Sequence, residues 1–153
     1  MRARMVPDYL EKLQGLQRGV APALTVVTHE QATPGDMVRL SRGYDAGLSG
    51  EEAPVLNREL CLGNKIFTYL AAGVPVILSR TPAQAALAGE LGDAAFTYGS
   101  VTDLAHVLRE LAAAPAKRRR AGRAARSAAQ ARWHWEHPAD RGALLDLFQR
   151  AIG

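Results

Sequence analysis

The apolar run VPVIL at residues 74 to 78 most constrains what this chain can fold into. It follows Gly73 directly, and the residues before it, from about Asn64 to Ala72, have a helical pattern. A glycine suits a helix C-cap because it adopts positive φ easily, and Pro75 blocks further helix. A short, largely β-branched apolar run is typical of a parallel strand covered on both faces. Residues 44 to 79 therefore predict a strand, a polar loop, a helix and a second, buried strand.

The same alternation extends along the chain. We expect helices over residues 7–20, 34–42, 64–72, 83–91, 101–113, 116–134 and 139–151, and strands over residues 23–28, 44–49, 74–79 and 94–98. Thr33-Pro34 and Thr81-Pro82 mark two helix starts, since Thr is a good N-cap and Pro suits the first helical position. Helices alternating with strands predict an α/β fold, a Rossmann-like parallel sheet of about four strands with flanking helices and a helical carboxyl-terminal tail.

Length and composition favour one globular domain over residues 1–153, with a core at 1–114 and carboxyl-terminal helices at 115–153. The chain is 48% apolar and 22% charged, which is typical of a folded protein rather than a disordered one. The lone Cys61 excludes an internal disulfide and suits a reducing compartment. The longest apolar run, residues 69 to 78, is far shorter than the ~20 residues that span a bilayer. We expect a soluble, cytoplasmic protein.

The start of the helix at residues 64–72 is the best candidate for a ligand site. In doubly wound sheets, ligands bind beyond the carboxyl ends of the strands, where a loop leads into a helix. The first helical turn offers unpaired N–H groups and a partial positive charge. Gly63 permits close approach of a ligand, Asn64 is a favoured N-cap, and Lys65 adds a cation. This combination predicts a cradle for a diphosphate.

The segment NKIFTYLAAGVPVILSRTP resembles the donor-nucleotide motif of GT-B glycosyltransferases of the large group 1, or family 4, kind. In that family a D-x-G-L-like strand end precedes a loop and a helix of the form (N/S)-K-φ-φ-E-Y-φ-A-x-G-φ-P-V-φ, where φ is apolar. The residues that match are Asp45, Gly47, Leu48, Asn64, Lys65, Phe67, Tyr69, Leu70, Ala71, Gly73, Pro75 and Val76. The family's Glu that holds the donor ribose is replaced here by Thr68, whose hydroxyl lacks the charge-assisted strength of a carboxylate.

The resemblance implies further contacts around a nucleoside diphosphate sugar. Thr68 would touch the ribose, and an acid of the loop, Glu51, Glu52 or Glu59, would meet the donor sugar, with Glu52 our candidate. The remaining candidates are Arg58 for a phosphate and His29 for the nucleotide base. It implies no cofactor and no metal, and the sequence has no close pair of zinc-type ligands. We assign no catalytic residue.

The resemblance also implies an incomplete enzyme. Residues 23–28, 44–49, 74–79 and 94–98 would be the third to sixth strands of a carboxyl-terminal lobe, and the pair Trp135-Glu136 would precede its last helix. The lobe's first two strands and the whole amino-terminal lobe have no counterpart. We expect a truncated product, a split subunit or an excised domain, inactive alone and able to transfer sugar to an acceptor hydroxyl only beside an amino-terminal lobe or partner subunit.

Two alternatives remain open at this stage. The first is a non-catalytic nucleotide-binding or interaction module that docks on a partner. The second rests on residues 117–132, KRRRAGRAARSAAQAR, which hold seven basic residues and no acid in a chain of net charge +4. Such a run is most often solvated surface, but it also suits an anionic membrane or, less well, nucleic acid, since no recognisable nucleic-acid module is present.

Overall fold

The computed structural model describes residues 11–12, 14–15, 18, 25, 27–51, 56–134 and 137–152. The chain divides into two compact units, residues 1–32 and residues 33–153. The described residues of the predicted helix 7–20 are helical, and its other residues lie outside the described part. The strand predicted at 23–28 is partly undescribed in the same way. Its described residues have no regular structure, and Val27 is 63% exposed. The β-propensity of Val27 is therefore not reinforced by burial, on which strand formation largely depends.

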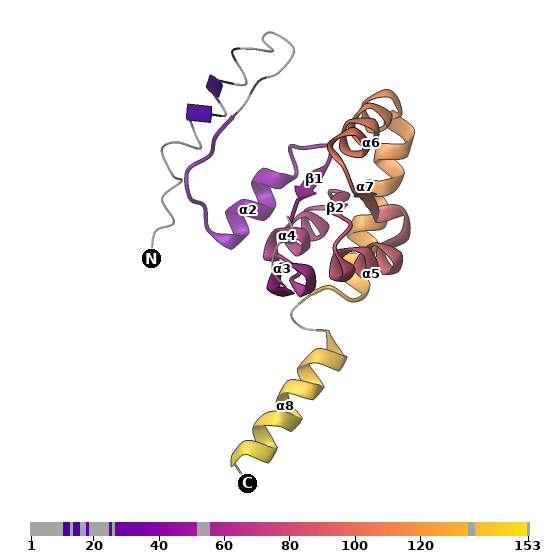
Figure 1. Cartoon of the computed structure of the whole chain (residues 1–153). Coiled ribbons are helices and arrows are strands. Elements are labelled where there is room, and N and C mark those ends of the chain that lie inside the picture. Colours follow the sequence, from indigo (N-terminus) through magenta and orange to yellow (C-terminus); the bar gives the residue numbers. More distant parts are fainter. Residues whose placement is uncertain are drawn as a thin grey trace. The chain divides into compact units, whose positions relative to one another are not determined.

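The second unit contains a parallel sheet with the strand order β1-β2-β3. Figure 1 labels β1 and β2 of this sheet. β1 is Gly47–Ser49, β2 is Val76–Ser79 and β3 is Ala95–Tyr98. Gly47 pairs with Val76, and Val76 pairs in turn with Ala95. The Rossmann-like α/β class is confirmed. The sheet of the described residues has three strands rather than about four, because the described residues 25, 27 and 28 of the predicted first strand do not join it.

Helices precede, connect and follow the strands. They are α2 Pro34–Ser41, α3 Leu56–Leu60, α4 Asn64–Ala72, α5 Pro82–Leu91, the 3₁₀ helix η1 Gly92–Ala94, α6 Val101–Ala113, α7 Pro115–Ala131 and α8 Pro138–Ile152. The bounds predicted for α4 are confirmed, whereas α3 lies in a stretch predicted to be a loop. Within the described ranges, no helix is long and apolar enough to cross a membrane.

β2 forms the centre of the core. All four of its residues are buried, and Val76 and Leu78 point to one face of the sheet because alternate residues of a strand share a face. They lie in one apolar cluster with residues of α4, α5, η1 and α7, namely Ile66, Leu70, Leu87, Leu91, Ala94, Ala125 and Ala129. Trp133 packs on the rim of this cluster, with its ring 5.3 Å from that of Phe67. The alanine-rich α7 therefore contributes to the core.

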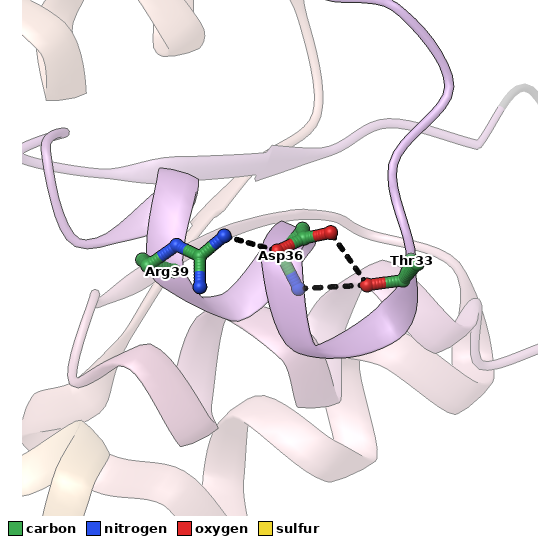
Figure 2. Close-up of polar contacts among 3 residues, drawn as sticks. All are labelled: Thr33, Asp36 and Arg39. Atoms are coloured by element: carbon green, nitrogen blue, oxygen red, sulfur yellow. Dashed lines mark hydrogen bonds and ion pairs between the residues drawn. The ribbon is translucent and has the colours of Figure 1, made fainter.

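The start of α2 shows how the Thr-Pro signal works (Figure 2). The Asp36 N–H donates to Thr33 Oγ1 at 3.2 Å, so Thr33 is the N-cap that the sequence predicts. Its hydroxyl donates in turn to Asp36 Oδ2 at 2.7 Å, and Arg39 pairs with the same carboxylate. In a capping box the acid would bind the N-cap backbone N–H. Here it binds the N-cap hydroxyl, which fixes the same turn.

Two glycines allow α7 to approach the end of α4 closely. Gly73 is the C-cap of α4 with φ 76°, and its N–H donates to the Leu70 carbonyl. A Cβ added to Gly122 would lie only 3.0 Å from the Gly73 carbonyl oxygen. Arg126 Nη2 also donates to the Ala72 carbonyl at 3.4 Å, which satisfies one of the last acceptors of α4. This contact joins the end of α4 to the middle of α7.

We expect Gly73→Ala to lower the free energy of unfolding by about 1–2 kcal/mol, because an L-residue is strained in the left-handed region. Urea unfolding followed by circular dichroism measures this. The matched control is Gly89→Ala in α5, where an added Cβ meets nothing within 4 Å, and a mid-helix alanine should stabilise by up to about 1 kcal/mol. Equal effects of the two substitutions would contradict the assigned backbone strain at Gly73.

Candidate functional site

The candidate site lies where the carboxyl end of β1 leads to the start of α4. Gly63 is the N-cap of α4 with extended backbone, φ −68° and ψ 140°, and no side chain caps the helix. The N–H groups of Asn64 and Lys65 are therefore open to a ligand, whereas the Ile66 N–H donates to the Gly63 carbonyl at 3.0 Å. The prediction that Gly63, Asn64 and Lys65 form this turn is confirmed. The prediction that Asn64 is the N-cap is wrong, because Asn64 is already the first helical residue.

Glu51 approaches this turn from the loop after β1. Its Oε1 lies 3.8 Å from the position that a Cβ on Gly63 would take, and Lys65 Cγ and Cε lie 3.9 Å from the same point. The helix dipole and the lysine favour negative charge here. A carboxylate, a cation and free N–H groups therefore meet around one glycine. Such a turn can bind an anion through the N–H groups and sugar hydroxyls through the carboxylate.

A buried polar network holds the loop of Glu51 in place. The Glu51 N–H donates to Ser79 Oγ at 3.0 Å, and Ser79 donates through both its N–H and its hydroxyl to Gln84 Oε1, at 2.9 and 3.1 Å. Gln84 Nε2 lies 3.5 Å from Ser49 Oγ. Ser49 and Gln84 are fully buried. The network joins the ends of β1 and β2 to the first turn of α5, and it therefore fixes the backbone position of Glu51.

Tyr69 fixes α4 against β1. A Cβ added to Gly47 would lie 2.3 Å from the Tyr69 ring, so only glycine fits beneath it. Burial raises the pKa of the Tyr69 hydroxyl. Tyr69 belongs to the same short helix as Lys65. The contact of Tyr69 with Gly47 therefore fixes the distance between α4, including its first turn, and β1.

The carboxyl end of β3 carries a second set of polar contacts. Asp103 Oδ2 accepts the Gly99 N–H at 3.0 Å and lies 3.9 Å from Arg80 Nη1. The Gly99 N–H, then the Ser100 hydroxyl and the Arg80 charge, lower the pKa of Asp103, against an opposing effect of desolvation. Because its pKa is lowered in the folded state, Asp103 stabilises the protein above its ordinary pKa. That contribution is lost as the pH falls through the lowered value.

Thr81 Oγ1, next to the network, is buried and makes no hydrogen bond within the described part of the chain. Thr81 occupies the N-cap position of α5 with extended backbone, but its hydroxyl does not cap the helix. The side chain of Gln84, in the first turn of α5, bonds to Ser79. The second Thr-Pro signal thus marks a helix start without the side-chain bond seen at Thr33.

The remaining predicted site residues are only partly placed. Thr68 is half-buried on α4, and its hydroxyl donates to the Asn64 carbonyl at 3.2 Å. Arg58 lies in α3, but its side chain, like all of Glu52, falls outside the described part. Glu59 is half-buried in α3. His29 is exposed and belongs to the separate unit of residues 1–32.

Glu51 is an acid that the structure places beside the helix start. Glu52, the acid chosen from the sequence, lies outside the described part, so that choice stays a prediction. Ser49, Ser79 and Gln84 were not singled out from the sequence, because their hydrogen bonds join residues up to 35 positions apart. Among the described residues, no group of three His, Cys, Asp or Glu side chains is placed to hold a metal ion.

Comparison with known proteins gives one match. A family model described as glycosyl transferase-like matches residues 7–142. Searches of curated proteins and of solved structures found no match. The matched residues cover most of the chain and include β1, α4, β2 and every residue of the candidate site.

We expect Gln84→Leu to lower the free energy of unfolding by about 1–3 kcal/mol, because the substitution leaves the buried Ser79 N–H without an acceptor. Denaturant titration of the full chain measures this. Gln130→Leu, at an exposed position of α7, is the matched control and should change stability by no more than about 0.5 kcal/mol. A Gln84 variant as stable as the control would show that the network does not support the fold.

Proposed function

The chain belongs to the glycosyl transferase-like family, and we propose that it is the donor-binding part of a glycosyltransferase. The observation that carries this proposal is the uncapped start of α4, where free N–H groups and Lys65 lie beside the loop that follows β1. The proposed donor is a nucleoside diphosphate sugar. Its sugar would pass to an acceptor hydroxyl when an amino-terminal lobe or a partner subunit completes the cleft.

The diphosphate would lie against Gly63, Asn64 and Lys65. As the glycosidic bond breaks, negative charge grows on the leaving diphosphate, and fixed dipoles and cations that face it lower the barrier. The helix N-terminus and Lys65 supply both features without rearrangement, since α4 is held at its other end by Gly73 and Arg126. The proposed transfer uses no cofactor.

Glu51 and Thr68 would hold the remaining parts of the donor. The Glu51 carboxylate lies beside Gly63, so it is placed to accept hydrogen bonds from sugar hydroxyls next to the diphosphate. Thr68 lies one helical turn after Asn64. Its hydroxyl already donates to the Asn64 carbonyl, which leaves its lone pairs to accept a hydrogen bond from a ribose. The free Cys61 fits the proposed cytoplasmic location.

A second candidate function is a nucleotide-binding module without catalysis. Thr68 favours this candidate, because it replaces the family's ribose-binding Glu and its hydroxyl already donates its hydrogen bond within α4, to the Asn64 carbonyl. Such a module would bind the nucleotide weakly and act by docking on a partner. The two candidates differ in whether an added amino-terminal lobe restores sugar transfer.

We expect the full chain to be stabilised by one of UDP, GDP, ADP and TDP in a thermal-shift assay. A ligand at ~100 times its Kd adds about 2.7 kcal/mol of stability, which is a shift of several degrees for this size. Lys65→Ala should weaken the effective nucleotide about tenfold or more, because it removes a charge-assisted contact.

The matched control is Lys12→Ala, which removes an exposed lysine of the other unit and should leave nucleotide binding unchanged. A cooperative melt that none of the four nucleotides shifts would refute donor binding by this chain. Binding that survives Lys65→Ala would move the site away from the start of α4.

A further inference from the structure

A hollow lies at the amino ends of β1 and β2, whereas the candidate donor site lies beyond the carboxyl end of β1. It measures about 490 Å³, within the roughly 300–1,000 Å³ typical of small-ligand sites. Asp45 and Pro75, which precede β1 and β2, form one side. Four side chains of α7, Arg118, Arg119, Arg123 and Arg126, also line it, and we call this hollow the arginine pocket.

Only part of this positive charge is neutralised by the protein. Arg118 pairs with Asp45, with Nε and Oδ1 3.2 Å apart, and also donates to the carbonyls of Leu111 and Ala112. Arg126 bonds to a backbone carbonyl of α4. Arg119 and Arg123 have no acidic partner among the described residues. Four arginines and one aspartate leave the pocket with three uncompensated positive charges.

The position of these charges on α7 is itself unfavourable without an anion. α7 begins at Pro115 with no side-chain cap and no acid in its first turn, and Lys117 to Arg120 follow as four consecutive cations. A helix N-terminus repels cations and attracts anions. Lys117 and Arg120 have partners elsewhere, Glu110 and Asp93, but Arg119 has none among the described residues.

Arg119, Arg123 and Arg126 are spaced i, i+4 and i+7, which places them along one face of α7. All three are exposed, so a single contact with each would be weak in water. A ligand with several acceptor oxygens can engage them together, and guanidinium groups match phosphate oxygens in bidentate geometry. The arrangement therefore favours a ligand with at least two negative charges.

We propose that the arginine pocket binds a phosphate-bearing anion of two or more negative charges, either a free phosphate ester or a lipid headgroup. The site is separate from the proposed donor site, because the two lie at opposite ends of α4. A helix of nine residues is roughly 14 Å long, so one diphosphate cannot reach both ends.

The test uses inorganic pyrophosphate and the full, ¹⁵N-labelled chain in an NMR titration. We expect amide shifts in residues 116–126 whose fitted Kd rises at least about tenfold in the double variant Arg119→Gln/Arg123→Gln. The matched control, Arg109→Gln/Arg141→Gln, removes the same charge from exposed positions outside the pocket and should change that Kd by less than about threefold. Spectra of all variants report whether the fold is retained.

Cosedimentation with phosphatidylcholine vesicles, with and without phosphatidic acid, distinguishes the two sources of phosphate. Cosedimentation that requires phosphatidic acid, and that is lost in the pocket variant but not in the control, identifies a lipid headgroup. Amide shifts with pyrophosphate but no cosedimentation identify a free phosphate ester. The proposal is overturned if pyrophosphate leaves the amides of residues 116–126 unshifted, or if both double variants weaken binding equally. Shifts confined to residues 63–68 would also refute it while leaving the proposed donor site intact.

Discussion

The burial of β2 is the constraint on which the rest of this structure depends. Its four residues are buried, and Val76, Ile77 and Leu78 pair with a strand on each side. The Ser79 N–H donates instead to the side chain of Gln84, so the strand leaves no buried donor unpaired at its end. Burial of an apolar strand requires helices against it, and α4, α5 and α7 contribute the apolar side chains that surround Val76 and Leu78. Both functional candidates follow from this arrangement. The carboxyl end of β2 supplies Ser79 to the polar network, and Pro75 at its amino end lines the arginine pocket.

The sequence predicts the end of a helix correctly where the backbone there accepts only a few residue types. Gly73 and Pro75 end α4 at the predicted residue, because few other residues tolerate those backbone angles. The strands are shorter than predicted, because the pattern of apolar residues does not show where the hydrogen-bonded pairing of two strands ends. The five-residue α3 has too few turns to produce a periodic pattern. Gln84 could not be identified as a site-supporting residue, because its role depends on Ser49 and Ser79 reaching it through the fold.

The arginine-rich helix shows a different limit of sequence reasoning. Composition indicated a basic surface and left open whether it was solvated or a binding face. In space the cations separate into two groups, because acids that are distant in sequence, Asp45 and Asp93, neutralise Arg118 and Arg120 but not Arg119. The alanines Ala121, Ala125 and Ala129 are buried on the opposite side, and their small size, together with Gly122, lets α7 lie close to α4. One helix thus serves as core and as charged surface.

α4 connects the two proposed anion sites, so its dipole could in principle couple them. Arginines near its carboxyl end stabilise the helix, and an anion in the pocket would offset part of that effect. The two ends are roughly 14 Å apart, whereas the Debye length in physiological salt is about 8 Å. Screening at the exposed termini therefore leaves little direct interaction between the two ligands. Coupling would need a movement of α4 itself, and the packing of Tyr69 on Gly47 and of Gly122 on Gly73 opposes such movement at both ends. The physical expectation is two sites that fill independently on one rigid helix.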